Sequence, residues 1–317
     1  MRLTVVAHFD PQGMLAPHVA RQLAELAASS DKLVVTTTSA LTDDARAQVR
    51  SLAELHERPN YGQDFYGWKE AIDRHFDADT YDELVLTNDT YVGPVRPFES
   101  ITTEAAKTDF DVWGITDSLR REHHIQSYLL FFTPPTLKSE TFRVFWRDLK
   151  PEKDRNTAIA TQEIGLSKAL RNGGFKIGGI FTPTPKEAAV GQLRRRHWHK
   201  MRSDLWPEFF QAPPAKEGAA PESEPETEPE NKVTCYADAV LDHGRMPLVK
   251  FDVLRYDPYW LGSDALLTAC EEAFPTHFEG VRDYLARTKP FYRRRVYENY
   301  GSHDLSFWAR RRIGYAR

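Results

Sequence analysis

Several polar residues stand directly after apolar runs, where the end of a buried strand would carry them. The clearest is Asp89, which closes the run Leu84–Asn88 and precedes Thr90. A carboxylate at a strand's carboxyl end can hold a hard divalent cation against a diphosphate, because Mg²⁺ binds through carboxylates, phosphate oxygens and water. The alternative is an ordinary turn, since Asn and Asp readily accept hydrogen bonds from their own backbone. Asp89 is therefore our first candidate metal ligand.

The elements that must position such residues alternate along the chain. Apolar β-branched runs predict strands over 2–9, 32–38, 83–87, 111–115, 126–132 and 175–181. Apolar residues at helical spacing predict helices over 15–28, 43–52, 66–76, 141–149 and 158–172. This alternation predicts an α/β fold with a mixed, mainly parallel sheet and flanking helices, in which ligands bind beyond the carboxyl ends of the strands.

Composition excludes several classes of protein. The chain has 317 residues, of which 41% are hydrophobic and 28% charged, which is typical of a globular protein. No stretch reaches the ~20 apolar residues of a membrane span, and the first residues turn polar too early for a signal peptide. We therefore expect a cytoplasmic protein. Cys235 and Cys270 are the two cysteines, so we expect reduced, packed thiols and no structural zinc of cysteine type.

A change of composition divides the chain. Residues 212–232 contain six Glu and five Pro in 21 residues, which leaves almost nothing to bury and predicts a disordered linker. It separates an α/β unit, 1–211, from a basic segment, 233–317, that is helical by pattern. We expect the first unit to carry the catalytic chemistry.

Five segments together resemble a known family. They are HFDPQG (8–13), NYGQDFYGWK (60–69), LVLTNDTYVGP (84–94), VWGITDS (112–118) and QEIGLSKAL (162–170). The resemblance is to the rhamnan synthesis F proteins of bacterial surface polysaccharide assembly, which are related to glycosyltransferases of the GT-A fold. It covers roughly residues 1–185 and, more weakly, 233–262.

The resemblance implies a GT-A-like (Rossmann-like) catalytic domain that takes a nucleotide-sugar donor. The sugar, rhamnose or a similar deoxyhexose, would pass to a glycan or lipid-linked glycan acceptor by an inverting single displacement. The alternative is a subunit that binds nucleotide or glycan without catalysis. The non-catalytic alternative is supported by the strand-end motif. The family's Asp-x-Asp maps onto Thr87-Asn88-Asp89, where only the second aspartate is present. One Asp with diphosphate oxygens and water can still hold Mg²⁺ or Mn²⁺.

The same resemblance implies contacts with the donor. Asn60 and Gly62 occupy the place of an Asn-x-Gly segment before the donor-binding helix, and Asn88 belongs to the strand-end motif. His8 and Asp10 end the first strand, where such proteins receive the nucleoside, although Asp-Pro is also a plain turn opener. Asp64 is a further candidate for binding nucleoside or sugar hydroxyls, and Lys69 is a candidate for binding phosphate. As an alternative, Lys69 is a solvated helix lysine.

Glu163 is the candidate catalytic base. It stands in the opening of the helix QEIGLSKAL, a position that resembles the acidic catalytic motif of inverting GT-A transferases. A base there would take the proton of the acceptor hydroxyl. The alternative is that a glutamate in a first helical turn is favoured by the helix macrodipole alone.

Two residues are candidate acceptor contacts. Asp117 ends a predicted strand and could orient donor sugar or acceptor, or it could cap a helix over LRREHH. Lys250 stands in a segment that resembles the family's C-terminal part, and it could also close over the donor phosphates. Within the predicted LRREHH helix, adjacent histidines diverge, so His123 and His124 do not indicate a zinc site.

Two basic clusters contain aromatic residues. One is 194–202 with Trp198, and the other is the tail 287–317 with Phe291, Tyr292, Phe307 and Trp308. The mixture predicts peripheral contact with anionic lipid at the inner face of the plasma membrane. The alternative is a solvated helix face or an intramolecular partner for acidic residues. Nucleic acid is not expected, and neither a dinucleotide-binding nor a P-loop motif is present.

Overall fold

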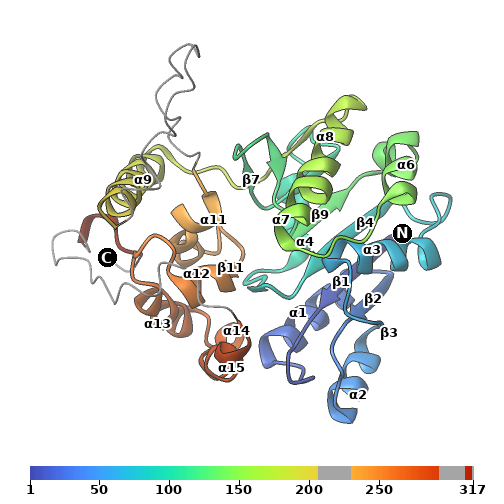
Figure 1. Ribbon diagram of the computed structural model, residues 1–317, viewed down its shortest axis with the longest axis horizontal. Coiled ribbons are helices and arrows are strands. Elements are labelled where there is room, and N and C mark those ends of the chain that lie inside the picture. The colour runs from blue at the N-terminus through green and yellow to red at the C-terminus, as the bar shows by residue number, and fades with distance from the viewer. Residues whose placement is uncertain (206–229, 293–310, 316–317) are drawn as a thin grey trace, which may run out of the picture.

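The computed structural model describes residues 1–205, 230–292 and 311–315. Most of the predicted linker 212–232 and most of the basic tail lie outside these residues. Within them, one seven-stranded sheet forms the centre of the larger lobe (Figure 1).

The strand order is β10-β6-β9-β4-β1-β2-β3. The strands are β1 (Arg2–His8), β2 (Lys32–Thr37), β3 (Glu54–Glu57), β4 (Glu83–Asn88), β6 (Val112–Gly114), β9 (Leu129–Phe132) and β10 (Ile177–Gly179). β9 runs antiparallel to β4 and β6, whereas the other neighbouring pairs are parallel. The predicted mixed, mainly parallel sheet is thereby confirmed.

Helices cover both faces because successive strand residues point to opposite sides. Val6 of β1 and Val85 of β4 join one apolar cluster with residues of α1 (Pro17–Ala28), α4 (Phe98–Ala105) and the chain beyond residue 232. Val5 and Leu86 join the other cluster. Its helices are α3 (Gln63–His75), α6 (Glu140–Asp148) and α8 (Ile164–Asn172).

Local signals in the sequence account for the helix boundaries. The expected helix 43–52 is α2 (Asp43–Leu52), in which the Thr42 side chain accepts a hydrogen bond from the Ala45 amide and two aspartates occupy the first turn. α3 begins at Gly62, whose φ of 76° is left-handed. A Cβ there would lie 2.5 Å from the Cβ of Tyr66. Both the left-handed backbone and this close approach therefore require glycine.

The helix predicted over 158–172 is interrupted. α7 (Arg155–Ala158) leads into a π-helical turn, η1 (Ile159–Glu163), and only then into α8. π-helical turns of this kind are frequent at functional sites.

The prediction of a helix over LRREHH is wrong. Asp117–Ser118 form a short strand, β7, that pairs antiparallel with β8 (His124–Ile125). Arg121, between them, has a left-handed φ of 67°, which turns the chain back instead of continuing a helix. Asp117 therefore does not act as a helix cap.

The C-terminal residues pack against the sheet domain. β11 (Val249–Lys250) pairs antiparallel with β5 (Tyr91–Val92), and one apolar cluster includes residues from both parts. The helices of this lobe are α11 (Lys232–Cys235), α12 (Phe251–Tyr256), α13 (Ser263–Ala273), α14 (Pro275–Phe278) and α15 (Val281–Thr288). Helix α9 (Pro185–Leu205) lies beside them, away from the sheet (Figure 1).

The remaining short elements connect these parts. They are α5 (Pro134–Leu137) and the 3₁₀ turns η2 (Ala237–Leu241) and η3 (Lys289–Phe291). Both cysteines are buried free thiols, as expected. Among the described residues, no helix is both long and apolar enough to cross a membrane.

Candidate functional site

The carboxyl ends of β1 and β4 bring together most of the polar residues singled out from the sequence. β1 ends at His8 and leads to Asp10, whereas β4 ends at Asn88 and leads to Asp89. These two strands are neighbours in the sheet, so their ends meet at one edge. The first turn of α3 adds Asp64 to the same place.

Asn88 forms the turn that the sequence allowed as an alternative. Its Oδ1 accepts hydrogen bonds from the backbone amide and hydroxyl of Thr90, at 3.2 and 2.7 Å. Its Nδ2 donates to Oδ2 of Asp64 at 2.8 Å. The amide of Asn88 is thus occupied in fixing the turn and in holding Asp64 beside the strand end.

Asp89 lies between this turn and the end of β1. Its Oδ2 accepts a hydrogen bond from the Phe9 amide at 2.8 Å, and the side chain is 12% exposed. Burial raises the pKa of Asp89 to about 8, although the Phe9 bond opposes this, and the charges of Asp64 and Asp10 raise the pKa further. Asp89 therefore faces a site poor in positive charge.

Asp64 has a similar environment. It is partly buried, and burial is the main cause of its raised pKa. The hydrogen bond from Asn88 opposes the shift, as do the charges of Lys250 and Arg155. No lysine or arginine among the described residues forms an ion pair with Asp64 or Asp89.

His8 and Asp10 are buried behind this edge. Nδ1 of His8 lies 2.9 Å from the Thr37 hydroxyl, and Nε2 lies 3.9 Å from Oδ2 of Asp89. Burial lowers the pKa of His8 to about 4, so the ring is neutral at pH 7. Asp10 pairs with Arg287 of α15, whose Nη2 lies 2.5 Å from Oδ2.

The ion pair with Arg287 explains why the pKa of Asp10 is lowered although the residue is buried. Burial alone would raise the pKa of Asp10, but the Arg287 guanidinium and the amides of Gln12 and Met14 outweigh it and lower the pKa. Arg287 was placed in a lipid-binding tail from the sequence. That placement is wrong for this residue, because its guanidinium turns inward to a buried carboxylate.

Glu163 ends the π-helical turn and is held by Ser127. Its Oε2 accepts hydrogen bonds from the Ser127 amide, at 2.7 Å, and from the Ser127 hydroxyl. Its Oε1 lies 3.6 Å from Nε2 of His124. Nδ1 of His124 lies 2.7 Å from the carbonyl oxygen of Glu122, which can only accept, so the proton of a neutral ring belongs on Nδ1. Oε1 of Glu163 is thereby left available.

Lys250 approaches the same group from the C-terminal lobe. Its ammonium lies 4.6 Å from the centre of the Tyr128 ring, in a cation–π contact. Burial lowers the pKa of Lys250, while the charges of Asp252, Glu163 and Asp64 oppose the shift. Among the described residues, no carboxylate forms an ion pair with it.

Three other predicted residues have different surroundings. Lys69 forms an ion pair with Asp73, one turn further along α3, at 2.9 Å. Asn60 is exposed in the loop before α3. Asp117 accepts hydrogen bonds from Lys232 and from Nε2 of His123, the latter at 2.9 Å. Their roles in binding stay predictions.

Comparison with known proteins gives the family. A sequence profile described as rhamnan synthesis protein F matches residues 33–198, just over half of the chain. The chain belongs to the rhamnan synthesis protein F family. The match includes Asp64, Asp89 and Glu163, whereas Lys250 and Arg287 lie beyond it.

One curated relative is an uncharacterized protein, y4gN, of Sinorhizobium fredii. It is 24% identical over 187 residues, which are 57% of this chain and 49% of the relative. This rhamnan synthesis F chain therefore spans about half the length of that relative.

Solved structures show weak similarity. A nucleotidyl transferase from a Methanothermobacter species is 12% identical with a TM-score of 0.36, and the match covers 58% of this chain and 88% of the other. A 4-diphosphocytidyl-2C-methyl-D-erythritol synthase from Anaerococcus prevotii is 9% identical with a TM-score of 0.34, over 56% and 87% of the two chains.

Two residues of the first basic cluster are buried. Arg194 is 1% exposed and pairs with Asp238, and Trp198 is 8% exposed and stacks on Tyr259 at 5.1 Å between ring centres. The predicted membrane contact is therefore wrong for Arg194 and Trp198, because both pack inside the C-terminal lobe. Residues 293–310 of the second cluster lie outside the described residues.

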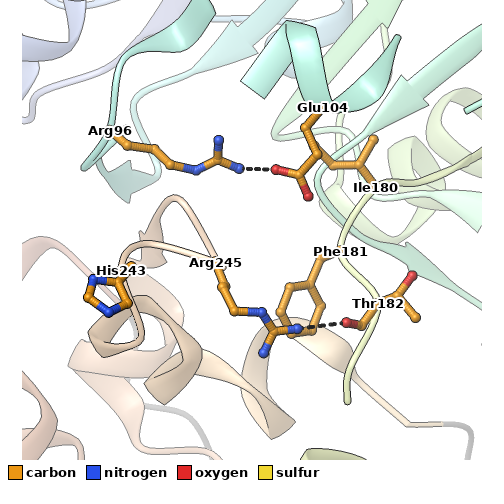
Figure 2. Close-up of a pocket in the computed structure, with 7 residues that line it drawn as sticks. All are labelled: Arg96, Glu104, Ile180, Phe181, Thr182, His243 and Arg245. Carbon is orange, nitrogen blue, oxygen red and sulfur yellow. Dashed lines mark hydrogen bonds and ion pairs between the residues drawn. The ribbon is translucent and has the colours of Figure 1, made fainter. Parts of the chain in front are cut away.

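A cavity of about 320 Å³ lies elsewhere, between the two lobes (Figure 2). Arg96 and Glu104 pair across one side at 2.5 Å, and Arg245 donates to the carbonyl oxygen of Thr182 on the other. Arg245 also pairs with Glu187 at 2.6 Å. Both guanidinium groups are engaged, so we do not place the chemistry there.

The residues that support the site have no motif that marks them for this role. Ser127 and His124 acquire it only because they lie beside Glu163, and Tyr128 only because it lies against Lys250. Arg287 could be noticed as a basic residue, but its partner Asp10 stands 277 positions away.

Proposed function

We propose that this chain is a glycosyltransferase that transfers a sugar, rhamnose or a similar deoxyhexose, from a nucleoside diphosphate donor. The acceptor is a surface polysaccharide or a lipid-linked glycan. Membership of a family named for rhamnan synthesis supports the substrate class. The observation that carries the proposal is the group at the carboxyl edge: Asp64 and Asp89 without a cationic partner, Glu163 with one available oxygen, and Lys250 without an anionic partner.

The donor diphosphate fits beside Lys250, Asp64 and Asp89, which have no partner of opposite charge among the described residues. Lys250 can donate to phosphate oxygens, and burial desolvates its ammonium, which lowers its pKa and strengthens such a contact. Burial raises the pKa of both carboxyl groups, and the charge of Asp64 raises the pKa of Asp89 further. The two groups fit a hard divalent cation, since a cation favours both ionised forms. We propose that Asp64 takes the place of the missing first aspartate. Mg²⁺ or Mn²⁺ held by Asp64 and Asp89 supplies neutralisation of the leaving diphosphate.

Glu163 acts at the acceptor. Its Oε1 takes the proton of the acceptor hydroxyl while the hydroxyl oxygen bonds to the anomeric carbon and the bond from that carbon to the diphosphate breaks. Ser127 holds Oε2 through two hydrogen bonds, so the carboxylate keeps one orientation. This is a single displacement, which inverts the configuration of the sugar.

Turnover and binding measured together test the proposal. Wild type and Glu163→Gln are incubated with a panel of nucleotide sugars and glycan acceptors, and nucleoside diphosphate binding is measured by calorimetry with Mn²⁺. We expect Glu163→Gln to lose ~10²-fold or more in kcat with binding retained. The matched control is Glu122→Gln, an exposed glutamate that pairs with Lys168 and Arg171.

One outcome would contradict the role of Glu163, and another would contradict the enzyme assignment. Turnover that persists unchanged in Glu163→Gln removes Glu163 as the base. Binding of nucleoside diphosphate with no turnover on any acceptor in wild type favours the alternative, a nucleotide-binding subunit of a polysaccharide assembly complex.

A further inference from the structure

A second group of ligand-type side chains lies at the far end of α3 from Asp64. Glu54 and His56 stand two residues apart on the edge strand β3, so they project from one face. His75 is the last residue of α3. The three side chains therefore join the edge of the sheet to the end of a helix.

Their ligand atoms converge. Nε2 of His56 lies 3.1 Å from Oε1 of Glu54, and Nε2 of His75 lies 3.4 Å from the same oxygen. The two Nε2 atoms are 3.1 Å apart. In a tetrahedral zinc site with bonds of about 2.0–2.1 Å, neighbouring ligand atoms are separated by roughly 3.3 Å. The three distances match one face of such a tetrahedron.

Cations at the outer nitrogens fix the tautomers of the two free rings. Nδ1 of His56 lies 3.1 Å from the Arg74 guanidinium, and Nδ1 of His75 lies 3.0 Å from the Lys32 ammonium. Both cations only donate, so each neutral ring would carry its proton on Nε2. Both Nε2–H groups then face Oε1 of Glu54, which accepts a hydrogen bond from His56 at 3.1 Å and lies 3.4 Å from Nε2 of His75.

A metal ion would take the place of these Nε2 protons between the three side chains. Binding at both Nε2 atoms moves each ring proton to Nδ1, so the two cations must turn away. Arg74 is exposed, and Lys32 has another acceptor in Oε2 of Glu54, at 2.9 Å. Neither movement leaves a buried charge without a partner.

The set of ligand atoms suits a transition metal. Two imidazoles and one carboxylate are typical ligands of Zn²⁺, whereas Mg²⁺ prefers oxygen ligands alone.

We propose that Glu54, His56 and His75 form a binding site for a divalent transition metal, with Zn²⁺ as the first choice. Three protein ligands leave a fourth position for water or for an external ligand. The ion ties the edge strand β3 to α3, the helix whose first turn carries Asp64. This site is separate from the carboxylates of the proposed donor site and does not depend on the proposed function.

Metal titration of the full chain tests the proposal. Chelator-treated protein is titrated with Zn²⁺ by calorimetry and with Co²⁺ by visible absorption, which reports tetrahedral coordination. We expect one ion per chain, and a loss of ~100-fold or more in affinity in His56→Ala and in His75→Ala, since even outer-shell changes cost 10–100-fold. Zn²⁺ should raise the Tm of wild type and leave that of His75→Ala unchanged.

Controls separate this site from the rest of the chain. His243→Ala removes an exposed histidine elsewhere, and Asp89→Asn alters the proposed donor site, so both should bind Co²⁺ as wild type does. Glu54→Gln keeps the size of the side chain and should weaken binding if a histidine variant does not fold. Absence of tetrahedral Co²⁺ binding in wild type would overturn the proposal. Binding that survives the loss of either histidine would overturn it as well.

Discussion

Two groups of buried charge in this molecule are arranged in opposite ways. In the C-terminal lobe, Arg194 is surrounded by acceptors. Its Nη atoms meet both oxygens of Asp238 at 2.7 Å, its Nε donates to the carbonyl oxygen of Ile313 at 2.7 Å, and the carbonyl oxygens of Cys235 and Gly314 accept the rest. At the carboxyl edge of the sheet, Asp64, Asp89 and Lys250 lie near one another without forming such pairs.

The difference distinguishes a structural cluster from the proposed ligand site. A buried charge is tolerated when partners replace its water, and Arg194 has all of them within the chain. At the carboxyl edge, burial raises the pKa values of Asp64 and Asp89, and no ion pair among the described residues offsets it. Charges that a fold leaves unbalanced in this way are characteristic of functional sites, where a ligand completes the pairing.

The largest effect on stability should come from Arg194. Arg194→Met leaves Asp238 and two segments of backbone without their donor, and breaking a buried pair costs about 3–5 kcal/mol. Denaturant unfolding should show this loss in the free energy of unfolding. Arg196→Met, on the exposed face of the same helix, is the control and should change it little. Equal stability of both variants would mean that Arg194 is not structural.

Lys250→Met should affect ligand binding and not folding. One charge-assisted hydrogen bond is worth about 1.5–3 kcal/mol, so nucleoside diphosphate affinity should fall ~10-fold or more. Calorimetry measures this affinity. Lys69→Met is the matched control, because the ammonium of Lys69 is paired with Asp73. A larger loss in the Lys69 variant would restore the phosphate contact expected from the sequence.

Asp64→Asn should lower the pKa of Asp89. The charge of Asp64 contributes to the raised value, but burial is the larger cause, so we expect a fall of about one pH unit or less from about 8. Carbon-detected NMR of the carboxyl group follows this titration. A pKa that does not move would show that the two carboxylates do not interact.

The raised pKa of Asp89 should also make the free energy of unfolding depend on pH. Asp89 has a raised folded pKa of about 8, so between about pH 4 and pH 8 the folded protein holds a proton that the unfolded chain has released. The contribution of this residue to stability therefore falls as pH rises through that range. Asp89→Asn should remove this part of the slope in unfolding measured at several pH values. An unchanged slope would contradict the raised pKa.

Much of the sheet domain could be predicted because its strands are buried on both faces. Runs such as 2–8 and 83–87 are apolar and β-branched, so no other element suits them. β3 (ELHE) was missed because a short polar edge strand has no such pattern. The sequence predicts a helix where the hairpin 117–125 lies. The turn of this hairpin depends on the left-handed backbone of Arg121, and helix and strand propensities do not indicate such a conformation.

The members of the candidate site could be proposed one by one from the sequence, but their arrangement could not. The end of a predicted strand suggested Asp89, and the family resemblance suggested Glu163. That Asp64 lies beside Asp89 follows from the packing of α3 on β4, fixed by the Asn88 amide, and no spacing along the chain reveals it. Lys69 follows Asp64 by five residues, which places it on another side of α3.

The ladder between β5 and β11 has a consequence for how the protein can be divided. Lys250 pairs in register with Tyr91, and the same apolar cluster continues from Val92 into Val249 and Phe251. A peptide bond cut between residues 206 and 229 breaks none of these contacts. Two polypeptides, one ending and one beginning there, should associate when expressed together and restore the proposed nucleotide binding.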